Sequence, residues 1–150
     1  MRMRAAVGAL IALAMSTERL SAASEATLQP GAYEVQVRLV LPNLDDNTAV
    51  KIVEICISDG GLHKNPGLAV LSDNNPLGKC PISEMRTMGN ELTFDIQCPG
   101  GNAARASARF ILGGASFKGR IEMNMGGKNM TMTEVQVGKR IRNCDANDGP

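Results

Sequence analysis

Residues 104–137, ARASARFILGGASFKGRIEMNMGGKNMTMTEVQV, indicate the fold of this chain most clearly. Three strand-like runs are separated by Gly113-Gly114 and by Gly126-Gly127. Short glycine turns join antiparallel neighbours, because glycine adopts the backbone conformations that tight reversals need. The stretch therefore predicts a three-stranded meander.

A hairpin is expected immediately before this meander. The run CPISEMRTM ends at Met88, the dipeptide Gly89-Asn90 marks a reversal, and ELTFDIQC follows over residues 91–98. In this last run apolar and polar residues alternate without a break, which is the pattern of a strand with one buried face. Two such runs around a short turn predict a β-hairpin.

Two further strands are expected nearer the N-terminus. The run LQPGAYEVQVRLVLP, residues 28–42, alternates in the same way, and AVKIVEICIS, residues 49–58, is rich in β-branched side chains. Residues 58–79 show no sustained period, so we expect a long loop with at most one short helix there. About seven strands with frequent turns predict an all-β fold, an antiparallel meander that forms a sandwich or a barrel.

The first 26 residues are typical of a secretory signal peptide. Arg2 and Arg4 precede an apolar run from Ala5 to Met15, and small residues follow up to Ala26. This run is shorter than the roughly 20 residues that a helix needs to cross a bilayer, so we expect no transmembrane span. Residues 27–150 are then expected to form a single disulfide-containing β domain in the periplasm or outside the cell.

The charge balance argues against nucleic-acid binding. Without residues 1–26, which hold three arginines and two glutamates, the chain has equal numbers of basic and acidic residues. It also has only three Phe, one Tyr and no Trp. It therefore lacks both the basic field and the stacking platform that nucleic-acid binding normally uses.

The cysteines predict two disulfides, because an even number in an exported chain is typical of a disulfide framework. With a three-residue loop over residues 88–90, Cys80 faces Cys98 across the hairpin, which leaves Cys56 for Cys144. A two-residue loop would instead place Cys80 and Cys98 on opposite faces. The sequence alone allows three connectivities.

Several of these motifs together resemble one protein family. The chain has PGAYEV near the expected mature start, ICIS before the long loop, CPISEMRTMGNELTFDIQCPG in the hairpin, MTMT in the last strand, and GKRIRNC at the end. This order resembles the domain of unknown function 3617 family of exported bacterial proteins, although the family's GDC-like ending is replaced by Arg142-Asn143-Cys144. The resemblance implies a periplasmic or secreted β domain and supplies no activity or catalytic residue.

The residue types argue against an enzyme and against a cofactor. The single histidine, His63, lies in the long loop, and a hydrolytic triad or a catalytic zinc site needs further partners beside it. The pair Asp45-Asp46 lies in a turn, whereas the carboxylates of a glycosidase oppose each other across a cleft. We therefore expect no catalytic residue, no metal and no cofactor.

Four methionines gather on the expected hairpin of residues 121–135. If residues 126–129 form a four-residue loop, Met125 faces Met130 and Met123 faces Met132, so all four side chains lie on one face. Thioethers can bind Cu(I), but methionine also fills irregular gaps in a core, and an apolar face is what a half-buried hairpin needs. We interpret these four residues as core or ligand-facing positions.

The expected function is non-enzymatic binding by an exported cell-envelope domain. The partner would be a small apolar ligand in the interior or an envelope protein on a face. The alternative is a periplasmic Cu(I)-handling protein that uses the Met thioethers.

Overall fold

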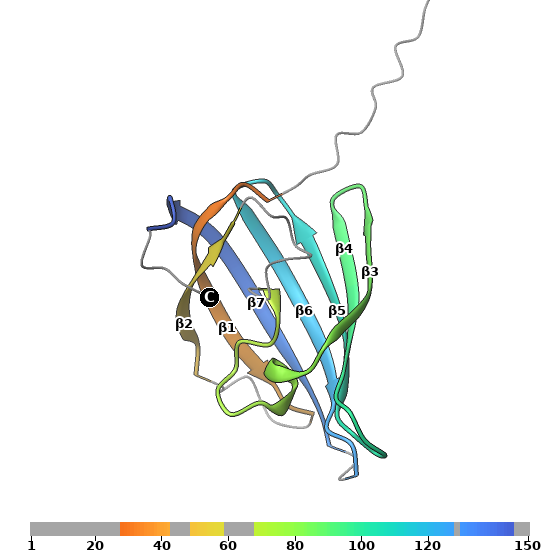
Figure 1. The fold of residues 1–150 in the computed structure, drawn as a ribbon. Helices are drawn as coiled ribbons and strands as arrows, with labels where there is room; N and C mark the ends of the chain where they lie inside the picture. The colour runs from red at the N-terminus through yellow and green to blue at the C-terminus, as the bar shows by residue number, and fades with distance from the viewer. Residues whose placement is uncertain (1–27, 43–48, 59–67, 128–129, 146–150) are drawn as a thin grey trace, which may run out of the picture.

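The structure is a computed structural model that describes residues 28–42, 49–58, 68–127 and 130–145. Seven strands follow one another along the chain (Figure 1): β1 (Gly31–Val40), β2 (Lys51–Ile57), β3 (Ile82–Met88), β4 (Glu91–Gln97), β5 (Arg105–Leu112), β6 (Ser116–Asn124) and β7 (Thr131–Arg142). One 3-10 helix, η3 (Pro76–Lys79), precedes β3. The expected signal peptide, residues 1–26, lies outside the described residues.

All seven strands belong to one antiparallel sheet with the order β2-β1-β7-β6-β5-β4-β3. The predicted all-β antiparallel fold is therefore confirmed. Its form is a single open sheet with β2 and β3 at the edges, rather than a two-sheet sandwich or a closed barrel. Strands β3 to β7 form a meander in which consecutive strands are neighbours. The first strand, β1, pairs with the last strand, β7. In the segment 58–79, where at most one short helix was expected, the described residues contain η3, and residues 59–67 lie outside the described residues.

One face of the sheet, called the inner face below, carries the core. Along β5 and β6 exposed and buried residues alternate strictly, as the sequence pattern predicted. The segment 68–80 runs across this face (Figure 1). Its residues Leu68, Val70 and Leu77 are buried and pack into the same core as the strands. The opposite face is called the outer face.

All four aromatic residues of the chain form one row across the inner face. The ring centroids of Phe94 and Phe110 are 5.7 Å apart, those of Phe110 and Phe117 5.8 Å, and those of Phe117 and Tyr33 5.9 Å. Two glycines make room for the row. A Cβ atom at Gly119 would overlap the ring of Phe110, and one at Gly138 would overlap the ring of Phe117. The row joins β4, β5, β6 and β1 into a single core.

The turn between β3 and β4 differs from the prediction. Met88 pairs with Glu91, so the loop has two residues rather than the three expected. A β-bulge then shifts the register, because Glu84 and Met85 together occupy the space between the pairs Ser83–Asp95 and Arg86–Thr93. Glu84 has a positive φ of 52°. The predicted loop was one residue too long, but the extra residue in β3 restores the predicted register at the start of that strand.

Candidate functional site

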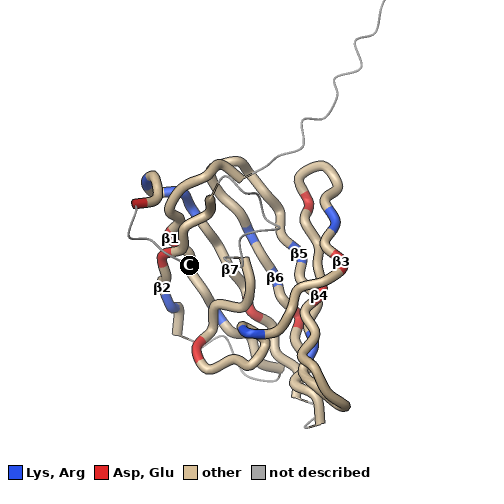
Figure 2. The backbone as a smooth tube through the Cα atoms, viewed as in Figure 1, with Lys and Arg blue, Asp and Glu red and all other residues tan. Residues whose placement is uncertain are grey.

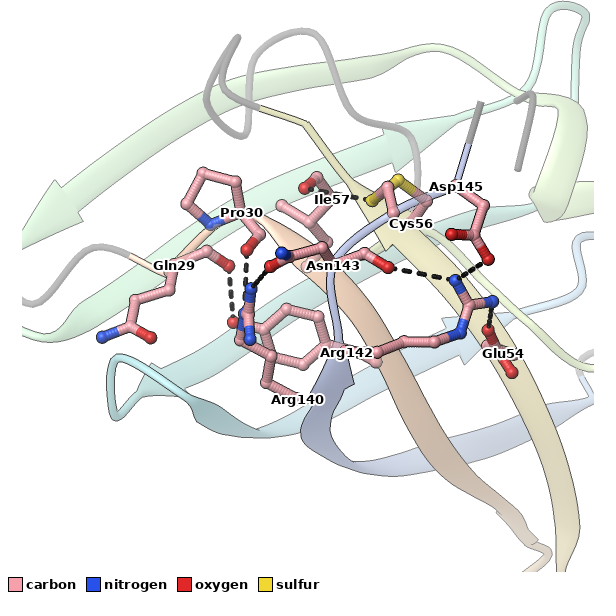
Figure 3. The surroundings of a disulfide bond; sticks show 11 residues. Gln29, Pro30, Glu54, Cys56, Ile57, Arg140, Arg142, Asn143 and Asp145 are labelled. Carbon is pink, nitrogen blue, oxygen red and sulfur yellow. Dashed lines mark hydrogen bonds and ion pairs between the residues drawn. A yellow bond between two sulfur atoms is a disulfide. The ribbon is translucent and has the colours of Figure 1, made fainter. Parts of the chain in front are cut away.

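The disulfide between Cys56 and Cys144 ties the end of the chain to the edge strand β2 (Figure 3). Beside it, Arg142 forms ion pairs with Glu54 and with Asp145. Arg140 donates a hydrogen bond from Nε to the carbonyl of Pro30 at 2.8 Å. The bridge and these contacts fasten β1, β2 and β7 together at one end of the sheet.

The second disulfide joins Cys80 to Cys98, with their Cα atoms 4.8 Å apart. Cys80 lies between η3 and β3, and Cys98 follows β4, so the bridge anchors the end of segment 68–80 to the sheet. The two bridges join the cysteine pairs that the sequence favoured, although the three-residue loop from which this pairing was derived is not present. No described cysteine is free. Each bridge joins an edge strand, or the segment next to it, to a residue that follows another strand.

The four methionines lie at the β6–β7 hairpin in the expected register. Met123 pairs with Met132, and the backbone N–H of Met125 donates to the carbonyl of Met130 at 2.8 Å. Met123 is buried, and its Sδ accepts a hydrogen bond from Asn75. Met125 and Met132 pack partly against the core, whereas Met130 is 45% exposed. Three of the four thus contribute to core packing.

A buried polar pair next to these methionines was missed by sequence reasoning. Glu134 and Gln136 point to the inner face of β7 and are fully buried. The carboxylate of Glu134 accepts hydrogen bonds from the backbone N–H groups of Leu71, at 2.8 Å, and Ser72, at 3.0 Å. Gln136 donates to Glu134 at 2.6 Å and to the carbonyl of Ala69 at 3.0 Å. Together they hold segment 68–80 against the sheet.

The alternation of residues along β7 could have predicted that Glu134 and Gln136 are buried. Positions 134 and 136 have the same parity as Met132, so a strand that buries Met132 must bury them too. Their partners lie more than 60 residues earlier in the chain. A buried polar side chain is tolerated only when it is hydrogen-bonded, and the sequence does not reveal such distant partners.

The outer face is polar and is hollowed across the middle strands. Two adjoining hollows have volumes of about 680 and 660 Å³ and share Asp95, Ser107, Arg120 and Glu122 as lining residues. The strand register explains why these side chains meet: Asp95 pairs with Ser107, and Ser107 pairs with Glu122. We call these four residues and the space they line the outer hollow.

Charges of both signs surround the outer hollow. Arg120 forms an ion pair with Glu122 at 3.0 Å, and Ser107 donates a hydrogen bond to Asp95 at 2.9 Å. Arg109 lies opposite Arg120, and its hydrogen bond to Glu91 raises the pKa of its guanidinium. Figure 2 shows basic and acidic positions interspersed over the sheet. The hollow therefore suits a polar ligand with donors, acceptors and charges of both signs.

The carboxylates of the outer hollow lie on an exposed face, where Asp95 accepts a hydrogen bond from Ser107 and Glu122 forms an ion pair with Arg120. Of the other acid–base candidates from the sequence, His63, Asp45 and Asp46 lie outside the described residues. In the parts of the chain that the structure describes, no three His, Cys, Asp or Glu residues gather as a metal site would require.

Sequence reasoning did not single out the outer hollow. Alternation along β4, β5 and β6 identified the outward positions, but the exact pairing of Asp95, Ser107 and Glu122 depends on turn lengths. The shape of this face also depends on the twist of the whole sheet. Neither quantity is encoded in one short motif.

Within the described residues, no helix is long and apolar enough to cross a membrane. No curated protein and no solved structure matches the chain. One family model, described as a protein of unknown function (DUF3617), matches residues 28–144, and those residues contain all seven strands and all four cysteines. The chain therefore belongs to the DUF3617 family.

Proposed function

We propose that this chain is an exported, non-enzymatic binding domain of the cell envelope that holds a polar envelope partner in the outer hollow. The observation that carries the proposal is the contrast between the two faces. The inner face is filled by the aromatic row and by segment 68–80. The outer face has a hollow in which polar side chains from β4, β5 and β6 converge. Ligand sites are concave surfaces with a few convergent polar groups.

Export is supported by the two disulfides, because such bridges persist in oxidising compartments such as the periplasm and the cell exterior. The leader-like residues 1–26 support the same location. Absence of catalysis is supported by the exposed, ion-paired state of Glu122 and by the hydrogen bond that Asp95 accepts.

Binding to envelope fractions tests the proposal. The purified protein is mixed separately with outer membranes, peptidoglycan sacculi and soluble periplasmic extract of the native host. Ser107→Trp places a large side chain in the middle of the outer hollow. Gln36→Trp is the matched control, because Gln36 is also exposed on the outer face but does not line the hollow.

We expect the protein to bind one of the fractions, Ser107→Trp to weaken that binding at least tenfold, and Gln36→Trp to retain it. Equal binding by both variants, or no binding to any fraction, would refute the proposal. An apolar molecule of lipid size that co-purifies from the native host, detected by native mass spectrometry, would favour the interior as the ligand site instead.

Cu(I) handling is the second candidate, and the pairing of Met123 with Met132 favours it, since it brings thioethers from two strands to one end of the sheet. Cu(I) competition titration tests it. Submicromolar binding that is lost when Met123, Met125, Met130 and Met132 are all changed to Leu, and kept in the control Met88→Leu, would support copper. Absence of such binding would leave these residues as packing groups.

A further inference from the structure

The two edges of the sheet differ in how well they could accept another strand. At the β3 edge, the bulge at Glu84 and Met85 interrupts the register, and Glu84 and Arg86 add charges that form an exposed ion pair. Bulges and edge charges are devices by which proteins prevent edge-to-edge pairing. The β3 edge is therefore protected.

The β2 edge has no bulge, and its two charged residues, Lys51 and Glu54, form ion pairs with residues outside the strand. Its seven residues pair with β1 in an unbroken register from Ile57 to Lys51. It contains no proline, no glycine and no bulge. Among the described strands only β1 pairs with it. A strand at the end of a sheet presents a row of backbone N–H and C=O groups on its outer side, and these groups fit another β-strand.

The side chains of this edge favour association. Ile52 is 60% exposed on the outer face, and Val50, just before the strand, is 56% exposed. The two charged residues of β2 are already neutralised within the molecule, since Lys51 pairs with Asp73 and Glu54 with Arg142. An incoming strand would therefore cover apolar surface and meet no unpaired charge.

We propose that β2 pairs antiparallel with β2 of a second copy, which joins the two sheets into one continuous sheet in a symmetric dimer. The difference between the edges selects this partner. Pairing of β2 with β3 of another molecule would build an open filament, but the protected β3 edge opposes it, whereas β2 with β2 is self-complementary and closes at two copies. The outer hollow is lined by residues of other strands, so each copy keeps its hollow accessible.

Lysine substitutions at the edge test the dimer. Val50→Lys with Ile52→Lys adds two positive charges to the β2 edge of each copy, and these charges would repel each other across the two-fold axis. The control is Met88→Lys with Val137→Lys, which adds the same charge at exposed apolar residues on β3 and β7. Molecular mass is measured by sedimentation equilibrium over a hundredfold range of protein concentration, and circular dichroism monitors folding.

We expect the unchanged protein and the control variant to approach twice the mass of one chain at the highest concentrations. The edge variant should keep the mass of one chain, with its circular dichroism unchanged. Hydrogen exchange should show that the amides of β2 become protected as the concentration of the unchanged protein rises. An unchanged protein that stays monomeric, an edge variant that still dimerises, or a control variant that does not dimerise would each overturn the proposal.

Discussion

Cys80 lies opposite Cys98 because β3 contains one residue more than its turn alone would require. From Met88 to Arg86 the two strands pair in the register of a two-residue turn, which would place the two cysteines on opposite faces. The bulge at Glu84 and Met85 moves the register by one residue, so Ser83 pairs with Asp95. A local irregularity thus brings the two sulfur atoms together on the inner face.

Deletion of Glu84 is expected to separate the two cysteines. Without the extra residue, the register of the turn would continue to the start of β3, and residue 80 would point away from Cys98. Peptide mapping without reduction should then find Cys80 and Cys98 as free thiols or in wrong pairings. Glu84→Gly is the control, because it keeps the bulge and suits the positive φ of this position. Quantitative formation of the native bridge in the deletion variant would contradict this account.

How much of the molecule the sequence predicts depends on the range of the interaction. Alternation is a local property, and it correctly identified the inner positions of β4, such as Phe94. The pairing of Met123 with Met132 was predicted correctly from the expected length of the loop between their strands. The bulge was missed because glutamate carries no signal for a positive φ. The burial of Glu134 was missed because its partners, Leu71 and Ser72, belong to a distant segment with no periodic pattern.

Glu134→Ala is expected to release segment 68–80 from the sheet. It removes the acceptor of two backbone N–H groups that are held within the fold, and the loss should lower the free energy of unfolding by about 3 kcal/mol. Urea denaturation with intact disulfides measures this change. Limited proteolysis should show faster cleavage within residues 68–79.

The control for Glu134 is Glu122→Ala on the outer face. Glu122 is exposed and forms only an exposed ion pair, so its removal should change the free energy of unfolding by no more than about 0.5 kcal/mol. Similar effects of the two substitutions would mean that Glu134 does not hold the segment in the way described.

Tyr33→Phe is expected to change both stability and its dependence on alkaline pH. The hydroxyl group of Tyr33 lies 2.7 Å from the carbonyl oxygen of Gln29 and 3.0 Å from that of Gly114, and its loss should cost about 1–2 kcal/mol. Burial raises the pKa of Tyr33 above its ordinary value of 10.0, although Arg140 lowers it in part. Above pH 10 the unfolded chain therefore loses this proton while the folded chain keeps it.

The sign of the pH effect follows from proton linkage. Since the unfolded state then binds fewer protons, the free energy of unfolding falls as the pH rises above 10, until the pKa of the folded state is passed. The stability difference between the unchanged protein and Tyr33→Phe should shrink over this range. Tyr33 is the only tyrosine, so tyrosinate absorbance reports its ionisation directly. Ionisation at or below pH 10 in the folded protein would contradict the prediction.

Gly138→Ala tests the aromatic row. The new Cβ atom would overlap the ring of Phe117, which must shift and disturb its contacts with Phe110 and Tyr33. Overpacking of this kind should lower the free energy of unfolding by about 2–3 kcal/mol. Gly101→Ala is the control, because a Cβ atom there meets nothing within 4 Å, and it should have little effect.

A double substitution separates this clash from any backbone effect of alanine. In a Phe117→Leu background the smaller side chain leaves room beside position 138, so Gly138→Ala should cost at least about 1 kcal/mol less there than in the unchanged protein. Urea denaturation of the four proteins in this cycle gives the coupling energy. If Gly138→Ala costs the same in both backgrounds, the glycine is required by the backbone of β7, and the ring of Phe117 does not explain why it is needed.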